Sequence, residues 1–80
     1  MAEAKINVLV TSGERVLFDG TATNLTFPGE QGMFEVLPLH RPLVTRLRAG
    51  QVTIDGRSIT IRHGVVRVAD DAVTAVVEVG

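Results

Sequence analysis

Short runs in which apolar and polar residues alternate fill most of the chain. Alternation with a period of two is the pattern of a β-strand that buries one face. No stretch carries the sustained 3.6-residue apolar repeat of a helix. Many short strands separated by turn residues predict an all-β fold, and we expect residues 1–80 to form one small antiparallel β-sandwich or flattened barrel. The runs lie at residues 5–11, 15–19, 21–27, 33–37, 42–48, 51–54, 58–61, 65–69 and 72–79.

Dipeptides that contain glycine or aspartate mark the expected turns. Asp55-Gly56 separates two β-branched runs and predicts a hairpin. This hairpin would place four apolar residues on one face: Val52, Ile54, Ile59 and Ile61. Three more dipeptides are expected to form turns: Asp19-Gly20, His63-Gly64 and Asp70-Asp71. Alternation in the run after Gly20 would turn four residues to one face: Thr21, Thr23, Leu25 and Phe27.

One stretch, residues 27–43, interrupts this pattern because it holds all three prolines of the chain. Proline has no N–H to donate to a sheet ladder, so we expect an ordered loop here, with Pro28 ending the strand before it. Within the stretch, Phe34 and Val36 are the better candidates for the core. Ordered loops on a rigid strand scaffold tend to carry binding surfaces, so this stretch is the first candidate for a functional site.

The composition excludes several classes of function. The chain has no cysteine, which rules out disulfides, thiolate zinc sites and a cysteine nucleophile. Its net charge of −1 and aromatic content of 4% supply neither the electrostatic field nor the stacking surfaces of a nucleic-acid binder. No apolar run approaches the roughly 20 residues that span a bilayer, so no direct membrane insertion is expected. Any membrane association would come through a protein partner.

Candidate catalytic residues are few. The two histidines, His40 and His63, lack the spacing to acidic residues that metal ligands show. Ser12 and Ser58 lie in apparent turns without the sequence pattern of a nucleophile elbow. The glycines around Glu30-Gln31 are accompanied by neither the lysine nor the helix of a phosphate loop. We therefore expect a protein that is not an enzyme and that uses no metal and no cofactor.

Two groups of residues have both a structural and a functional interpretation. His40 lies between Pro38 and Pro42, where its imidazole either fixes the loop through hydrogen bonds to the backbone or contacts a partner. Six of the arginines either form a solvated polar face or bind an acidic partner surface. They are Arg41, Arg46 and Arg48, with Arg57, Arg62 and Arg67 on later strands.

The run from Gly32 to Thr45, followed by Leu47–Gly50, resembles the signature of the epsilon subunit of F-type ATP synthase. In that family a glycine-rich turn leads through a short apolar strand into a Pro-x-His-x-Pro-Leu element, which is Pro38–Leu43 here. The similarity covers roughly Ile6 to Val77 and includes three flanking stretches: Leu17–Gly20, Gly64–Val68 and Val73–Val76. The chain departs from the common form at three positions, where Met33 replaces an acidic residue, and Glu35 and Leu39 each replace a glycine.

Typical members of that family continue into a C-terminal helical hairpin that can inhibit hydrolysis and that binds ATP in some members. This chain ends at Gly80, where the sandwich would end, so it resembles the short forms that keep only the β-sandwich. The resemblance therefore implies neither inhibition by that route nor an ATP site.

The resemblance implies a non-catalytic rotor subunit of the central stalk. Such a subunit links the gamma subunit to the polar loops of the membrane c-ring and couples ion-driven rotation to ATP synthesis. The implied location is peripheral, on the cytoplasmic face of the plasma (inner) membrane or its equivalent in an organelle. By matched position, six residues would face the c-ring: Glu30, Gln31, Gly32, Met33, His40 and Arg41. Ser12 and residues near Val44 would face gamma.

Two other interpretations are compatible with the residues. One is a free-standing β-sandwich module that binds another protein. The other is an enzyme or a lipoyl- or biotinyl-carrier domain. A carrier needs its modified lysine exposed at a hairpin tip, whereas Lys5, the only lysine, lies in the first predicted strand.

Overall fold

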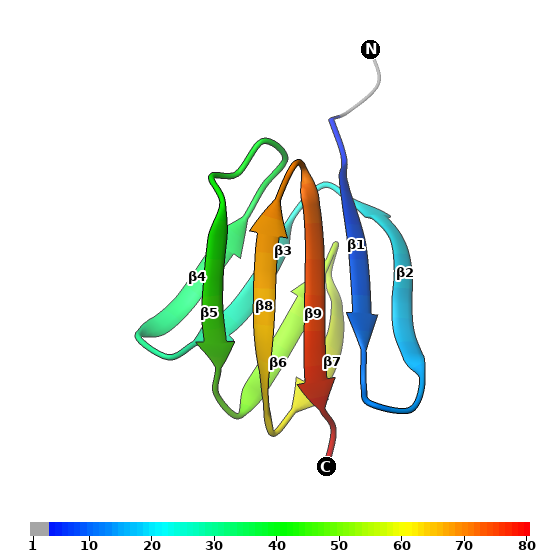
Figure 1. Cartoon of the computed structure of the whole chain (residues 1–80), viewed down its shortest axis with the longest axis vertical. Coiled ribbons are helices and arrows are strands. Elements are labelled where there is room, and N and C mark those ends of the chain that lie inside the picture. Colours follow the sequence, from blue (N-terminus) through cyan, green and yellow to red (C-terminus); the bar gives the residue numbers. More distant parts are fainter. Residues whose placement is uncertain (1–3) are drawn as a thin grey trace.

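A computed structural model describes residues 4–80 and shows an all-β fold, as predicted (Figure 1). Within these residues there is no helix, and so none long and apolar enough to cross a membrane. Nine strands follow one another along the chain: β1 (Ile6–Thr11), β2 (Val16–Ala22), β3 (Leu25–Gly29), β4 (Gly32–Val36), β5 (Leu43–Leu47), β6 (Gly50–Ile54), β7 (Arg57–Ile61), β8 (His63–Ala69) and β9 (Ala72–Glu78).

The strands form one sheet that folds over into two layers. Its order is β2-β1-β9-β8-β5-β3-β6-β7, and β4 pairs with the other edge of β3. In Figure 1 the front layer holds β2, β1, β9, β8 and β5, and the others lie behind. The layers are joined where Gly29 of β3 pairs with Leu47 of β5. All pairings are antiparallel except that of β1 with β9, which brings the first and last strands side by side.

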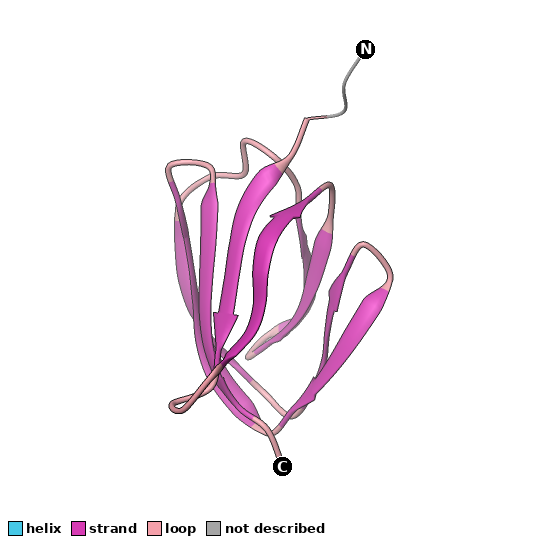
Figure 2. Ribbon diagram, turned by 90° about the vertical axis from the view of Figure 1, so that its right-hand side faces the viewer, coloured by secondary structure: helices cyan, strands magenta, loops and turns pink. Residues whose placement is uncertain are grey.

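A small aliphatic core lies between the two layers, which face each other in the side view of Figure 2. Alternate residues of each strand point inward, as the period-two pattern predicts. Phe27 is the largest fully buried side chain, and its ring stacks on Phe34 with 5.6 Å between centroids. Val36 is fully buried and Phe34 is partly buried, which confirms both as core residues. Among residues 4–80 no polar or charged residue is buried.

The prediction that residues 27–43 form a loop is wrong for its first half. Pro28 lies inside β3 and pairs with Met33 of β4, so the chain forms a hairpin whose turn is Glu30-Gln31. On the other side of β3, pairing with β6 stops at Thr26 and pairing with β5 involves only Gly29. The missing N–H of Pro28 therefore interrupts no ladder, and its carbonyl still accepts a hydrogen bond from the Arg48 N–H at 2.8 Å. Only residues 37–42 form a loop.

Two of the four expected turns are absent. Asp19-Gly20 lies within β2, where Gly20 pairs with Val8, so Thr21 continues β2 and the chain turns later, at Thr23 and Asn24. His63-Gly64 lies within β8. The turns at Asp55-Gly56 and Asp70-Asp71 are confirmed, and in both the two turn residues have positive φ, from 48° to 87°. Gly20 is not among the residues with positive φ, so that dipeptide continues the strand.

The Asp55 carboxylate ties the β2–β3 connection to the β6–β7 turn. Its Oδ1 accepts hydrogen bonds from the Thr23 hydroxyl at 2.7 Å, the Thr23 N–H at 2.9 Å and the Asn24 N–H at 3.0 Å. These bonds favour the ionised form, and the bond from the Thr23 hydroxyl, followed by that from the Asn24 N–H, lowers the pKa of Asp55 below its usual 3.8.

Replacing Asp55 with asparagine should therefore make stability depend less on pH. A carboxylate whose pKa is lowered on folding stabilises the folded state above its unfolded pKa and loses that contribution as pH falls through the folded pKa. Asp55→Asn should lower the Tm at neutral pH, and the gap from wild type should close below about pH 4. Circular dichroism melts over this range test it, with exposed Asp19→Asn as the control. A gap that stays constant with pH would contradict the prediction.

Candidate partner-binding surfaces

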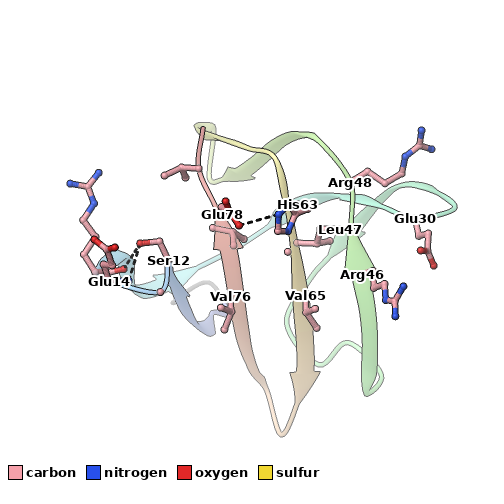
Figure 3. A pocket seen from close by; sticks show the side chains of 15 residues that line it. Ser12, Glu14, Glu30, Arg46, Leu47, Arg48, His63, Val65, Val76 and Glu78 are labelled. Atoms are coloured by element: carbon pink, nitrogen blue, oxygen red, sulfur yellow. Dashed lines mark hydrogen bonds and ion pairs between the residues drawn. The ribbon is translucent and has the colours of Figure 1, made fainter.

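Two hollows indent the surface of the domain. The first, which we call the hairpin hollow, has a volume of about 460 Å³ and lies between the β3–β4 hairpin and the start of β5. It is lined by residues 29–34, His40 and residues 43–45. The second, the sheet-end hollow, has a volume of about 960 Å³ and is drawn in Figure 3. It is lined by residues 12–15, Glu30, and the ends of three strands at residues 46–48, 63–65 and 76–79.

The structure brings six of the eight predicted partner-binding residues to the hairpin hollow: Glu30, Gln31, Gly32, Met33, His40 and Val44. Arg41 is exposed beside His40 and does not line the hollow. Ser12 lines the sheet-end hollow, and Glu30 lines both. The residues expected to face the c-ring thus share a surface with Val44, which was expected near gamma, while Ser12 lies on the other surface.

His40 shapes the loop at the edge of the hairpin hollow. Its Nδ1 lies 2.7 Å from the carbonyl oxygen of Arg41, and its backbone N–H donates to the carbonyl of Leu37 at 3.1 Å. A carbonyl oxygen can only accept, so Nδ1 carries the proton. These contacts support the structural interpretation of His40, in which the imidazole fixes the loop by bonding to the backbone.

Leu39 occupies a strained position at the tip of the same loop. Its φ is 67°, in the left-handed region where a residue with a Cβ costs roughly 1–2 kcal/mol and glycine costs little. Its N–H donates to Oδ1 of Asp71 at 2.9 Å, which ties the loop to the β8–β9 turn. The side chain is 84% exposed. The glycine that the family resemblance implies at this position would adopt this φ without that cost, and here an apolar side chain is presented instead.

The sheet-end hollow combines apolar and charged side chains. His63 and Glu78 face each other across β8 and β9, with Nε2 and Oε2 3.1 Å apart, and both are largely exposed (Figure 3). An exposed pair of this kind contributes less than about 1 kcal/mol. Val65 and Val76 lie beside it, and Arg46 and Arg48 lie on the neighbouring strand end. The hollow therefore offers shape, apolar surface and charge for binding.

Sequence reasoning missed the exposed valines of this surface. Val65 was predicted only as part of a strand, residues 65–69, with no face assigned to it. In the structure the alternation of β8 turns Val66 and Val68 inward and leaves Val65 with Arg67 on the outer face. The signal was present in the pattern, because Arg67 marks the outward set of residues. Val76, which pairs with Val65, follows the same rule in β9.

The fold and these hollows define a small two-layer β-sandwich domain that presents binding surfaces at loops and strand ends. Residues 5–79 match the family described as ATP synthase, Delta/Epsilon chain, beta-sandwich domain, and the chain belongs to this family. The resemblance seen in the sequence is thereby confirmed. Membership also agrees with the expectation of a non-catalytic chain.

Curated relatives include proteins named ATP synthase epsilon chain. That of Leptospira borgpetersenii is 35% identical over 80 residues, and those of a Nitratiruptor species and of Sulfurimonas denitrificans are 40% and 37% identical over 74 and 83 residues. The alignments cover 95%, 86% and 98% of this chain, but only 63%, 57% and 62% of the relatives. The chain thus spans about three fifths of the length of these relatives.

Solved structures show the same fold at lower identity. A chain of the Euglena gracilis mitochondrial ATP synthase, in a structure of OSCP, F1 and the c-ring, has a TM-score of 0.83 at 21% identity, covering 92% of this chain and 51% of that one. A chain of the Tetrahymena thermophila mitochondrial ATP synthase, from a structure of its central stalk and c-ring, has a TM-score of 0.75 at 11% identity. The match covers 98% of this chain and 66% of that one.

Proposed function

We propose that this chain is a non-catalytic rotor subunit of the central stalk of F-type ATP synthase. In this role it links the gamma subunit to the polar loops of the c-ring and couples ion-driven rotation to ATP synthesis. The match of residues 5–79 to the epsilon-chain sandwich family carries the proposal. Its place would be peripheral, on the cytoplasmic face of the plasma membrane or the equivalent face in an organelle.

The positions of the two hollows support contacts with two partners. The hairpin hollow gathers Met33, His40 and the Glu30-Gln31 turn, so we assign the c-ring to this surface, together with the adjacent Arg41. The sheet-end hollow holds Ser12, so we assign gamma to this surface. The aliphatic core between two hydrogen-bonded layers gives a stiff body that transmits torque without doing chemistry.

Co-purification of the tagged chain with gamma and the c-ring of the same organism tests this proposal. We expect the wild-type chain to retain both. Arg41→Glu should retain gamma and weaken capture of the c-ring by about tenfold, because Arg41 is exposed beside the hairpin hollow and its reversal changes the charge at that surface only. The cleaner variant is Arg41→Glu rather than His40→Ala, since His40 also holds the loop.

A control variant separates loss of an interface from loss of the fold. Arg57→Glu makes the same charge change on β7, away from the residues that line either hollow, and should bind both partners as wild type does. Failure of the folded wild-type chain to bind gamma under any condition would contradict the rotor proposal and favour a free-standing module with another partner.

A further inference from the structure

The loop of residues 37–42, between β4 and β5, carries His40 and Arg41, which are assigned above to the c-ring surface. The two prolines of this loop fix φ only at their own positions, so they leave the conformation of the three residues between them open. Two local hydrogen bonds join His40 to the carbonyls of Leu37 and Arg41. These bonds shape the turn, but neither fixes the loop relative to the rest of the domain.

One side-chain hydrogen bond joins this loop to another part of the domain. The Leu39 N–H donates to Oδ1 of Asp71 at 2.9 Å, although the two residues lie 32 positions apart in the sequence. Among the side-chain hydrogen bonds found in residues 4–80, no other connects residues 37–42 to a different element. We call this contact the loop–turn bond. Figure 1 shows the loop and the β8–β9 turn at the same end of the domain.

The turn that accepts this bond is itself held firmly. Asp70 and Asp71 have φ of 52° and 58°, and Ala69 pairs with Ala72 across them, so they form the two-residue connection of a regular hairpin. The backbone carbonyl of Asp71 also accepts a hydrogen bond from the Asn7 N–H at 3.2 Å, which ties the turn to the start of β1. The Asp71 carboxylate is therefore attached to a fixed point of the front layer.

The loop adopts a conformation at Leu39 that this residue does not favour. Its φ of 67° lies in the left-handed region, and a leucine without an external constraint would return to negative φ. The side chain is 84% exposed, so its burial does not hold this φ in place. Since the φ of Leu39 sets the course of the chain that follows, its return to negative φ would move His40 and Arg41. The loop–turn bond opposes that movement.

We propose that Asp71 is a positioning residue for the partner-binding loop. Its carboxylate holds Leu39 in the strained conformation. This keeps His40 at the hairpin hollow and Arg41 exposed beside it, in the arrangement that binds the c-ring. The inference rests on the proposed function and adds to it a residue that does not line the hollow. Without the bond the loop would populate other conformations, and the apparent affinity would fall in proportion to the fraction that remains competent to bind.

Removal of the acceptor tests this proposal. Asp71→Gly deletes the carboxylate, and glycine adopts the positive φ of the turn without strain. This variant should weaken capture of the detergent-solubilised c-ring of the same organism about fivefold and leave capture of gamma unchanged. Amide exchange at Leu39, measured by NMR, should speed up at least about tenfold. Asp71→Asn removes the charge but keeps an Oδ1 that accepts, so it should stay close to wild type in all three measurements.

Two further variants make the test specific. Asp70→Gly is the matched control, because it removes a carboxylate from the neighbouring position, which also has positive φ, and leaves the loop–turn bond intact. It should behave as wild type does. In Leu39→Gly, the residue at the strained position adopts this φ without cost, so the loop depends less on the bond. Asp71→Gly should therefore weaken c-ring capture by about twofold or less in the Leu39→Gly background.

Each outcome supports or overturns the inference. If wild type captures the c-ring but Asp71→Gly matches Asp70→Gly in capture and in Leu39 exchange, Asp71 does not position the loop, and the rotor role stands. If Asp71→Gly loses gamma and the c-ring alike, Asp71 serves the fold alone and the inference is wrong. An equal loss of c-ring capture with leucine or glycine at position 39 would indicate direct contact by Asp71 and would also overturn it. If wild type does not capture the c-ring, the inference and the proposed function both fail.

Discussion

Phe27→Ala is expected to remove about a quarter or more of the stability of this domain. The side chain is fully buried in β3 and stacks on Phe34, so its truncation leaves a cavity between the two layers. Truncation of a large aromatic side chain in a core lowers the free energy of unfolding by about 3–5 kcal/mol. The whole free energy of unfolding of a domain of this size is only about 4–12 kcal/mol. The loss corresponds to a fall in Tm of more than about 10 °C.

Urea unfolding followed by circular dichroism measures this loss, because the chain has no tryptophan or tyrosine to report by fluorescence. Phe27→Leu is the matched control: it keeps an apolar side chain at the site and should lose clearly less stability. Phe18→Ala provides a second comparison, since Phe18 packs at the margin of the core and is only partly buried. If Phe27→Ala were no less stable than Phe18→Ala, Phe27 would not contribute to the core what its complete burial indicates.

The successes and failures of the turn predictions have one physical cause. Asp55-Gly56 and Asp70-Asp71 lie between strands that pair directly with each other, so the local turn chemistry and the sheet agree. Asp19-Gly20 has equally good turn chemistry, but β1 pairs with β2 through Gly20 and beyond, to Ala22. A turn there would lose these pairs and would expose Ala22, which is fully buried. Long-range pairing outweighed the local preference.

Pro28 failed as a strand terminator for a related reason. A proline breaks a strand only when a neighbouring strand needs its N–H, and the residues that decide this belong to β4, β5 and β6, the three strands that follow β3 along the chain. Sequence alone shows the missing donor. It does not show that β3 changes partner from β6 to β5 at this point, which leaves no acceptor waiting opposite Pro28.

The hairpin hollow was predictable and the sheet-end hollow was not. Residues 29–45 lie close in sequence, so their prolines, glycines and His40 identified one surface before any fold was known. The sheet-end hollow gathers Ser12, Arg46, His63 and Val76 from four separate parts of the chain. These residues meet only because β1 pairs in parallel with β9, and β9 and β5 flank β8. No local pattern contains that topology.

Gly64→Ala is expected to distort the front layer at the point where this topology is tightest. A Cβ at Gly64 would lie 2.6 Å from the carbonyl oxygen of Val76 and 3.0 Å from the Cα of Val77, both backbone atoms of β9. Backbone cannot rotate away as a side chain can, so β8 and β9 must separate. Overpacking of this kind costs about 1–3 kcal/mol, and we expect Gly64→Ala to lower the Tm accordingly.

The strain should be local as well as global, because Gly64 pairs with Leu47 on one side and Val77 on the other. Amide hydrogen exchange should speed up at Val65 and Val77 more than in β6 and β7, which lie in the other layer. Gly13→Ala is the matched control, since a Cβ there meets nothing within 4 Å. If Gly64→Ala and Gly13→Ala had the same Tm and the same amide exchange rates, β8 and β9 would be able to separate without loss of stability. The close approach at Gly64 would then not set the spacing of Val65 and Val76 on the outer face.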